Sequence, residues 1–296
     1  MRRVLITGIT GYIGSNLARG LLPDCEVYGL AREPVNETYI ADIREQVRLL
    51  VCDGSYASVE TALREAAPEL VYHLAAYYTG ARGASDTPKL LAANVALGGY
   101  LLEAMCSAGC GALVFASSVM AHYGGAAYRP LNLYAATKRA MSDLIAYYTD
   151  AGLLRAVTLV LSDTYGPGDQ RPKILNLILH AAQNGEPIDL SDGKQEYDVV
   201  YIDDVVRAFR MAGERALAAP ERADETYQVC AAEPLTLRDT VETLQRVSGI
   251  TLNARWGARP PQEREQRKSV RLYPALPGWR QQTALCEGLA TFCGML

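Results

Sequence analysis

The chain has 296 residues, of which 49% are hydrophobic and 21% charged, with a formal net charge of −4 and an isoelectric point near 5.5. This length and composition suffice for a sizeable core, and they exclude a disordered chain, a collagen-like chain and a disulfide scaffold. The mildly acidic balance argues against a general nucleic-acid binder, which would be strongly basic, and no uninterrupted apolar run reaches the ~18 residues of a membrane span.

Short apolar runs alternate with longer amphipathic stretches through the first half of the chain, which indicates parallel βαβ units. We expect strands at residues 4–7, 26–30, 48–52, 70–74, 112–116 and 156–161. Helices are expected between them, at residues 15–22, 58–66, 89–108 and 135–151. Continuous apolar strands suit a parallel sheet that is buried on both faces, so the sequence predicts an α/β fold.

The regular alternation of strands and helices ends after residue 163, where glycines and prolines indicate a loop. A helix at 174–184, a loop at 192–194, a strand at 199–202 and a helix from 204 are expected next, followed by helices mixed with proline-rich loops. We therefore predict two lobes, a nucleotide-binding domain over residues 1–163 and a smaller substrate lobe over 164–296, with 199–215 returning to the first.

Three glycines, Gly8, Gly11 and Gly14, follow the first expected strand in the spacing GxxGxxG. One glycine permits a tight turn, the next lets a pyrophosphate approach the backbone, and the last lets the helix pack on the strand. The N-terminus of the helix then offers backbone N–H groups to phosphates. We prefer this interpretation, a dinucleotide site, to a purely structural turn. The same glycines interrupt the apolar stretch after Arg3, so it is not expected to be a signal peptide.

Tyr134 and Lys138 lie four residues apart at the start of an expected helix, and so on one face of it. A nearby ammonium favours a phenolate and lowers the pKa of the tyrosine, which could then exchange a proton at a carbonyl or alcohol carbon. An ordinary exposed helix turn is the alternative. Upstream, Ser117 and Ser118 end a buried strand, where ligands bind in open parallel sheets.

Together, the glycine turn, Ser118 and the Tyr134/Lys138 pair resemble the extended short-chain dehydrogenases/reductases, specifically their NAD(P)-dependent epimerase/dehydratase branch. Further stretches resemble landmarks of this family: Asp53-Gly54, His73-Leu74-Ala75-Ala76, Asn94, Tyr165-Gly166-Pro167, residues 201–205, and Leu276-Pro277-Gly278-Trp279. The resemblance implies a Rossmann-type doubly wound parallel sheet with a smaller α+β C-terminal substrate lobe.

The resemblance also implies roles for individual residues. Tyr134 would be the acid/base, Lys138 would bind the nicotinamide ribose, and Ser118 would orient the reacting oxygen. Cofactor contacts would come from Gly8, Thr10, Gly11, Tyr12, Ile13, Gly14, Arg32, Asp53, Gly54, Leu74, Ala75, Ala76, Asn94, Ser117, Tyr134 and Lys138. The nucleotide-sugar substrate would contact Thr79, Ser118, Asp163, Arg171 and Lys173. No metal site is expected.

Departures from the family pattern narrow the reaction. The 4,6-dehydratases carry Asp-Glu after the hydroxyl residue, whereas Val119 and Met120 follow Ser118 here and cannot act as acids or bases. The epimerase-reductases use a cysteine where Val119 stands, and Cys110 and His180 lie elsewhere and are interpreted as structural. Neither of those reactions is therefore expected.

The end of the second expected strand bears on the cofactor. NAD-selective enzymes carry an acid there for the ribose hydroxyls, whereas this chain has Ala31 followed by Arg32. A guanidinium can hold a 2′-phosphate with two hydrogen bonds, so NADP(H) is the preferred cofactor, with NAD(H) possible. NADP(H) in turn favours a net reduction, and a surface arginine is the alternative interpretation.

The amino-acid sequence of residues 130–138, 163–167 and 171–173 resembles that of a narrower group, the reductases of nucleoside-diphosphate-4-keto-6-deoxyhexoses such as CDP-abequose synthase. Asp163 stands where many relatives have Asn, and Tyr197 where many have an Arg near the sugar diphosphate. The phosphate charge would then be met by Arg171, Lys173 or an arginine within residues 264–271.

We therefore expect an NADPH-dependent 4-ketoreductase of an activated deoxysugar. A nucleotide-sugar 4-epimerase with tightly bound NAD remains open because it would use the same residues. A dehydratase, a reductase of non-sugar ketones and a cofactor-sensing regulator are more remote alternatives. A cytoplasmic homodimer with reduced cysteines, and without nucleic-acid or membrane partners, is expected.

Overall fold

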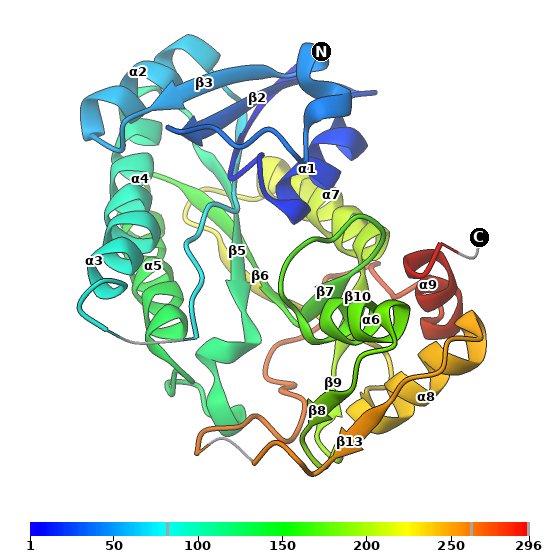
Figure 1. The fold of residues 1–296 in the computed structure, drawn as a ribbon. Coiled ribbons are helices and arrows are strands. Elements are labelled where there is room, and N and C mark those ends of the chain that lie inside the picture. Colours follow the sequence, from blue (N-terminus) through cyan, green and yellow to red (C-terminus); the bar gives the residue numbers. More distant parts are fainter. Residues whose placement is uncertain (81–82, 261–262, 295–296) are drawn as a thin grey trace.

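The computed structural model describes residues 1–80, 83–260 and 263–294, and it has a seven-stranded parallel sheet at its centre (Figure 1). The strands run in the order β3-β2-β1-β4-β5-β6-β11. Their bounds are β1 Arg2–Thr7, β2 Cys25–Arg32, β3 Arg48–Cys52, β4 Leu70–His73, β5 Ala112–Ser118, β6 Arg155–Leu161 and β11 Asp224–Val229. The doubly wound sheet expected from the sequence is confirmed.

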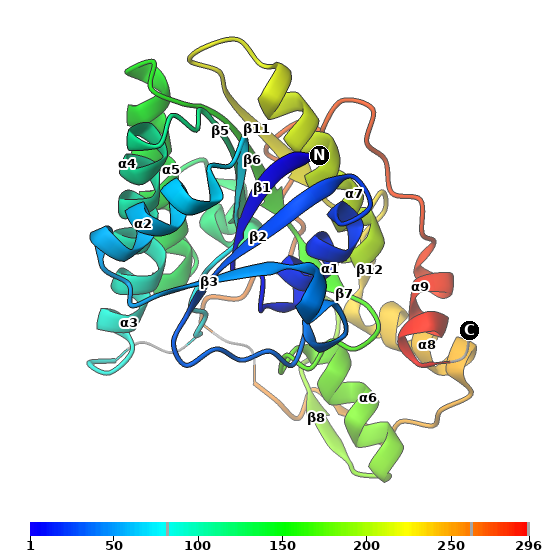
Figure 2. The same ribbon diagram turned by 90° about the horizontal axis from the view of Figure 1, so that it is seen from above.

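Helices cover both faces of this sheet, as the view from above shows (Figure 2). One face carries α2, α4 and α5, and the other carries α1 and α7. Along β1, Val4 and Ile6 belong to the core on the α1/α7 side, whereas Leu5 belongs to the opposite core. This alternation is the period of two that a strand imposes. The bounds are α1 Tyr12–Leu21, α2 Tyr56–Ala66, α4 Leu97–Ser107, α5 Leu133–Asp150 and α7 Ile202–Ala218.

A smaller lobe lies beyond the carboxyl ends of the strands (Figure 1). It contains α6 Ile174–Asn184, α8 Leu237–Ser248, α9 Leu285–Phe292 and the short strands β7 Asp163–Tyr165, β8 Ile188–Leu190, β9 Glu196–Tyr197, β10 Val199–Tyr201, β12 Leu235–Thr236 and β13 Ala254–Trp256. These strands form three two-stranded pairs, β7 with β10, β8 with β13, and β9 with β12. One-turn helices also occur: η1 Ala41–Gln46, η3 Val119–Ala121 and η4 Tyr123–Gly125.

The sequence analysis missed β11, which extends the main sheet beside β6 although it lies within the predicted substrate lobe. Its sequence, DETYQV, begins with three polar residues, and its second half is buried although it contains the polar Gln228. The prediction relied on continuous apolar runs, which this strand lacks. Helix α7 packs on β4, β5 and β6, whereas β10 pairs with β7 of the smaller lobe. The division into two domains, with residues 199–215 returning to the first, stays a prediction.

The helix expected at residues 89–108 is longer and is interrupted. It runs as α3 Thr87–Leu91, a π-helical turn η2 Ala92–Ala96, and α4. By length and composition alone, the helical segment Thr87–Ser107 could cross a membrane. The sequence analysis did not find it, because it considered only uninterrupted runs of apolar residues. In the fold, α4 packs against α2 and α5, and Asn94 of the π turn is buried and hydrogen-bonded. We interpret the segment as a core helix.

Close packing of α7 on the sheet leads to a first prediction. A Cβ added at Gly213 of α7 would overlap the buried ring of Tyr72 and approach the Leu70 side chain. We expect Gly213→Ala to lower the free energy of unfolding by about 1–3 kcal/mol through overpacking. Chemical denaturation measures this change. In the matched control Gly99→Ala, the added Cβ meets only Leu144 at 3.9 Å, so that variant should equal or exceed the wild type. Equal destabilisation of both variants would contradict the packing argument.

Candidate active site

The strand order reverses between β1 and β4, and three residues join the carboxyl ends of these strands. Oγ1 of Thr7 accepts a hydrogen bond from the backbone N–H of Ala75 at 3.2 Å and lies 2.7 Å from Nδ1 of His73. Complete burial lowers the pKa of His73 to about 3, so its ring is neutral. Thr7 therefore shares one hydrogen bond with the neutral ring of His73 while it accepts another from Ala75. In open α/β sheets, ligands bind at such a reversal point.

The glycine turn closes against this junction. Gly8 has φ +75°, and a Cβ there would lie 2.7 Å from the Ala75 nitrogen. A Cβ at Gly14 would overlap the Gly8 carbonyl. Gly11 is the N-cap of α1 and accordingly offers no side chain to the first helical turn. The tight turn and the helix packing predicted for these glycines are present in the structure, and the approach of a pyrophosphate to the backbone stays a prediction.

A groove of about 500 Å³ runs from the glycine turn along the ends of β1, β2, β3 and β4. Nine of the predicted cofactor residues line it: Gly8, Thr10, Gly11, Arg32, Asp53, Gly54, Leu74, Ala75 and Ala76. One end of the groove is formed by the glycine turn, where the backbone is accessible, and the other end carries the polar residues Arg32 and Asp53. This arrangement fits a dinucleotide with its pyrophosphate at the N-terminus of α1. The residues present therefore fit the implied nicotinamide cofactor.

Two polar side chains mark the far end of the groove. Asp53 accepts a hydrogen bond from the Ser55 backbone at 2.8 Å, and this contact holds the pKa of its carboxyl at about 2. The carboxylate is thus charged and can accept hydrogen bonds. Arg32 ends β2 on the groove wall, and no described residue forms an ion pair or side-chain hydrogen bond with it. Its guanidinium therefore remains available to an anion.

The other predicted cofactor residues lie off the groove wall. Tyr12, Ile13 and Gly14 form the first turn of α1, and Ser117 is buried near the end of β5. The Tyr12 ring contacts the substrate lobe, because its hydroxyl donates to the Pro167 carbonyl at 3.3 Å.

Asn94 is engaged within the protein. Its amide donates to the Tyr77 carbonyl at 3.0 Å and to Oγ1 of Thr137 at 2.9 Å, and its oxygen accepts from the Tyr77 N–H at 2.7 Å. Both of its N–H donors are used in this way. Asn94 thus ties the π turn to the loop after β4 and to α5, and its contact with a cofactor stays a prediction.

Tyr134 and Lys138 occupy the first two turns of α5, which Asn132 caps by accepting from the Ala135 N–H at 2.9 Å. Nζ of Lys138 donates to the carbonyl of Ala116 in β5 at 2.9 Å. It also lies 4.9 Å from the Phe115 ring centre and 6.0 Å from that of Tyr134. Helix α5 is therefore fixed against the carboxyl end of β5, beside the predicted serines.

The protonation of this pair differs from the expected one. Burial raises the pKa of the Tyr134 phenol above its ordinary value, and the neighbouring Tyr78 adds to the rise. Lys138 was expected to lower that pKa, but its ammonium is directed at the Ala116 carbonyl, and burial lowers its own pKa to about 7. The phenol therefore carries its proton at neutral pH, as a general acid must.

Ser118 ends β5 with its side chain turned back on the following turn. Its Oγ accepts a hydrogen bond from the Met120 N–H at 3.2 Å. Among the described residues, no acceptor is recorded for its own hydroxyl proton, so this proton can be donated to a ligand oxygen. Helix α5 packs against the short helix that follows Ser118, which brings this hydroxyl into the neighbourhood of Tyr134.

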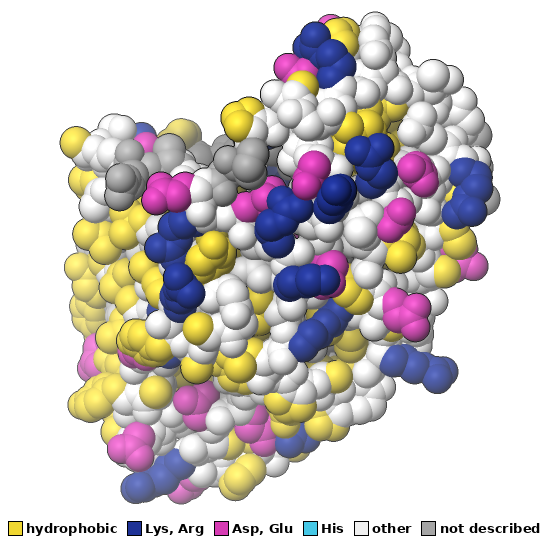
Figure 3. Space-filling model, turned by 90° about the horizontal axis from the view of Figure 1, so that it is seen from below, with side chains coloured by type: hydrophobic (Ala, Val, Ile, Leu, Met, Phe, Trp, Pro, Cys, Tyr) yellow, Lys and Arg dark blue, Asp and Glu magenta, His cyan; other side chains and the backbone are white. Residues whose placement is uncertain are grey.

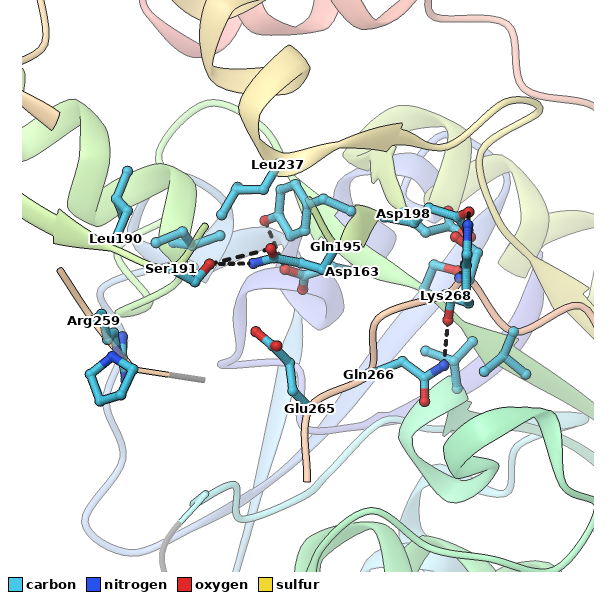
Figure 4. Close-up of a pocket in the computed structure, with 18 residues that line it drawn as sticks. Asp163, Leu190, Ser191, Gln195, Asp198, Leu237, Arg259, Glu265, Gln266 and Lys268 are labelled. Atoms are coloured by element: carbon cyan, nitrogen blue, oxygen red, sulfur yellow. Dashed lines mark hydrogen bonds and ion pairs between the residues drawn. The ribbon is translucent and has the colours of Figure 1, made fainter. Parts of the chain in front are cut away.

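A second cavity, of about 350 Å³, opens from Val119 into the smaller lobe (Figure 4). Asp163 lines it near β7, and Glu265 points into it from the opposite loop. Two buried hydroxyl oxygens of its lining residues, Ser162 Oγ and Ser269 Oγ, lack a hydrogen bond of ordinary geometry among the described residues, whereas the buried Asp198 Oδ2 is ion-paired with Arg271 at 3.1 Å. Buried hydroxyls of this kind suit a polar ligand.

The predicted substrate cations are already paired. Lys173 forms an ion pair with Asp163, whose other oxygen accepts from the Tyr197 hydroxyl at 3.0 Å. Arg171 binds both oxygens of the buried Asp169, at 2.7 and 2.6 Å. Neither of these cations lines the cavity. Thr79, another predicted substrate contact, is half-buried in the loop after β4 and does not line the cavity either. The predicted phosphate contacts of Arg171 and Lys173 would have to compete with these carboxylates.

The arginines of the segment 264–271 are also engaged. Arg264 donates to the Pro130 carbonyl at 2.7 Å, Arg267 pairs with Asp192 and Glu265, and Arg271 pairs with Asp198. Arg259 lines the cavity instead, and the described residues give it no ion pair or side-chain hydrogen bond. The sequence analysis missed this arginine, since nothing in its local pattern distinguishes it from other exposed loop residues.

Other cavity residues were missed for a similar reason. Ser162 precedes the predicted Asp163 and could have been found from that neighbour, whereas Ser191, Gln195 and Asp198 come from a loop and a short strand without a recognisable pattern. Within the described ranges, no cluster of three or more histidine, cysteine or acidic side chains could hold a metal ion.

Comparison with known proteins adds a family to this geometry. The profile of the NAD dependent epimerase/dehydratase family matches residues 4–230. The chain is 31% identical to CDP-abequose synthase of Yersinia pseudotuberculosis over 70% of this chain and 71% of that one. It is 28% identical to UDP-glucose 4-epimerase of Mycolicibacterium smegmatis over 97% and 96% of the two chains. The structure of Thermus thermophilus UDP-glucose 4-epimerase in complex with NAD superposes with a TM-score of 0.82 at 28% identity, covering 100% and 98%.

The buried Lys138 leads to a second prediction. Because its pKa falls to about 7 in the folded chain, against about 10.4 when unfolded, the unfolded state binds more protons between these values. The stability of the wild type should therefore rise with pH across this window. Lys138→Met removes the buried charge. We expect it to raise the free energy of unfolding at pH 6 by about 1–3 kcal/mol, after the lost Ala116 hydrogen bond is subtracted.

Chemical denaturation of both proteins, freed of bound nucleotide, at pH 6 and pH 9 measures this effect. The advantage of Lys138→Met should shrink at pH 9. A variant less stable than the wild type at pH 6, or an advantage that grows with pH, would contradict the buried-charge argument.

Proposed function

Because this chain belongs to the NAD dependent epimerase/dehydratase family, we propose that it is an NADPH-dependent reductase. Its substrate would be the C4 ketone of a nucleoside-diphosphate-4-keto-6-deoxyhexose. More broadly, it is an oxidoreductase of the nucleotide-sugar-modifying type. The single observation that carries the proposal is the placement of Tyr134 on α5. Lys138 of the same helix is hydrogen-bonded to Ala116 of β5, the strand that Ser118 ends.

The side chains around Tyr134 can perform the protein's part of a ketone reduction. Bound NADPH would supply a hydride to the carbonyl carbon. Tyr134, which burial keeps protonated, would donate its proton to the carbonyl oxygen as negative charge develops there. Ser118 would donate a hydrogen bond to the same oxygen, since its own acceptor site is occupied by the Met120 N–H. Lys138 would hold positive charge beneath the Tyr134 ring.

Two features support NADPH over NADH. Arg32 lies on the groove wall without a described partner, and a guanidinium binds a phosphate with two parallel hydrogen bonds. Ala31 gives the end of β2 no acid to accept from ribose hydroxyls. NADPH suits a net reduction because the oxidised cofactor must leave and be replaced at every turnover.

A 4-epimerase with tightly bound NAD is the second candidate. UDP-glucose 4-epimerases resemble this chain over nearly its whole length, and the same three residues would serve both reactions. The cofactor separates the candidates, because an epimerase retains NAD whereas a reductase consumes NADPH. Val119 and Met120 speak against the dehydratase alternative, since neither side chain can exchange a proton.

We also propose a homodimer built on α4 and α5. The large side chains Leu91, Tyr100 and Tyr147 are exposed on the helices of this face. Figure 3, seen from below, shows hydrophobic side chains gathered on this side of the molecule, while Lys and Arg form a band across the rest. An exposed apolar face of this kind suits an interface between subunits.

The third prediction concerns Tyr134. Tyr134→Phe removes only the phenolic oxygen, so the fold and cofactor binding should persist while kcat falls by about 10²–10⁴, the usual contribution of a general acid. NADPH oxidation with CDP- and dTDP-4-keto-6-deoxyglucose as substrates measures kcat. A folded Tyr134→Phe protein with unchanged turnover would rule out the mechanism, and a wild type that oxidises NADPH with neither ketone would overturn the proposed reduction.

The fourth prediction concerns Arg32. Arg32→Ala should weaken NADPH binding about tenfold to a hundredfold, because a charge-assisted hydrogen bond contributes ~1.5–3 kcal/mol and ~1.4 kcal/mol is tenfold in affinity. NADH binding should barely change, and Ala31→Asp combined with Arg32→Ala should reverse the preference. Calorimetric titration with both cofactors tests this. If the wild type prefers NADH, or both cofactors weaken equally, the epimerase becomes the better assignment.

A further inference from the structure

Tyr78 lies directly beside Tyr134 and yet remains largely open to solvent. The two ring centres are 4.9 Å apart and the ring planes are nearly perpendicular, at 82°. Of the Tyr78 surface, 60% is exposed, although an aromatic ring of this size usually has much of its surface buried. Tyr134 is half-buried, and the pKa of its phenol is raised by desolvation and partly by Tyr78. An exposed aromatic ring thus borders the proposed proton donor.

The backbone around Tyr78 is held in place in spite of this exposure. Asn94 binds both the N–H and the carbonyl of the preceding residue, Tyr77, at 2.7 and 3.0 Å. The same amide donates to Thr137, whose hydroxyl donates to the Tyr134 carbonyl at 2.7 Å. The backbones of Tyr77 and Tyr134 are thus linked by hydrogen bonds through Asn94 and Thr137, and the rings of Tyr78 and Tyr134 are in contact. Together these contacts fix Tyr78 relative to Tyr134.

Residues next to Tyr78 and next to Ser118 in the sequence line the two cavities. Tyr77 lines the cofactor groove, and Val119, directly after Ser118, lines the cavity of the smaller lobe. A substrate carbon that reacts must lie within reach of both the cofactor and the Tyr134 hydroxyl. Because the Tyr78 ring contacts the Tyr134 ring and is largely exposed, a substrate group that reaches Tyr134 can also contact Tyr78.

We propose that Tyr78 is a specificity-determining residue whose ring forms one wall of the site for the reacting sugar. This assignment rests on the proposed function, since it takes the substrate to be a nucleotide sugar. A pyranose ring carries C–H groups on its faces, and these make favourable contacts with an aromatic ring. A 6-deoxysugar adds a methyl group, which suits an apolar wall better than a hydroxymethyl group does. Tyr78 acts on the sugar and not on the nucleotide or the cofactor.

Equilibrium binding separates these contributions without requiring turnover. Calorimetry with CDP-glucose and UDP-glucose, with the sugar-free CDP and UDP, and with NADPH is carried out on the wild type, Tyr78→Ala and Tyr78→Phe. Tyr147→Ala is the matched control. Because Tyr147 also lies on the proposed dimer face, light scattering first establishes that this variant keeps the oligomeric state of the wild type. Tyr147 is 65% exposed and makes a similar edge contact with Tyr148 at 5.3 Å, but lies near the far end of α5.

Tyr78→Ala should lower the affinity for the sugar nucleotide that the wild type binds by about tenfold. Its affinities for the sugar-free diphosphate and for NADPH should stay within twofold of the wild type. Tyr78→Phe keeps the ring and should stay within threefold of the wild type, as should Tyr147→Ala. With the 4-keto-6-deoxy substrates, Tyr78→Ala should raise KM more than it lowers kcat.

Three results would overturn the assignment alone: unchanged sugar-nucleotide binding in Tyr78→Ala, an equal loss for sugar-free diphosphate, or a Tyr78→Phe variant as weak as Tyr78→Ala. A wild type that binds neither CDP-glucose nor UDP-glucose would instead overturn the proposed function, and the role of Tyr78 with it.

Discussion

The hydrogen bonds of the Thr7 hydroxyl hold together the point on which the site depends. The hydroxyl accepts from the Ala75 N–H and lies against the neutral ring of His73. It thereby ties the carboxyl ends of β1 and β4 at the place where the strand order reverses. Gly8 must lack a Cβ because Ala75 lies so close to it. The cofactor groove and the start of α1 follow from this junction.

The second constraint is the burial of charge beside the reacting groups. Lys138 is almost fully buried and has one carbonyl partner, and its pKa accordingly falls to about 7. Such a group costs stability and is retained where a site requires it. In the smaller lobe, by contrast, most cations near the cavity are paired with carboxylates, as Lys173 with Asp163 and Arg171 with Asp169. A bound diphosphate would therefore have to compete with carboxylates for these cations. Arg259 differs, because it has no ion pair among the described residues.

The site was partly predictable because its main parts lie in contiguous patterns. The glycine turn, the serines that end β5 and the Tyr134/Lys138 spacing each occupy one short stretch, and the expected elements carry them to the same edge of the sheet. Asn94 and Tyr78 were different, because their partners lie far away in sequence. The amide of Asn94 could have faced a cofactor, and only the fold shows that Tyr77 and Thr137 occupy it.

The sequence by itself determined the parallel sheet, the turn that begins α1, and the residues able to exchange a proton, because local periodicity and residue chemistry encode these features. The tertiary structure alone decided that β11 joins the sheet edge and that Lys173 is paired with Asp163 of β7. It also decided that Tyr134 keeps its proton. Each of these depends on the burial and distance of groups brought together from separate parts of the chain. Electrostatic and packing energies of that kind have no signature in any single stretch of sequence.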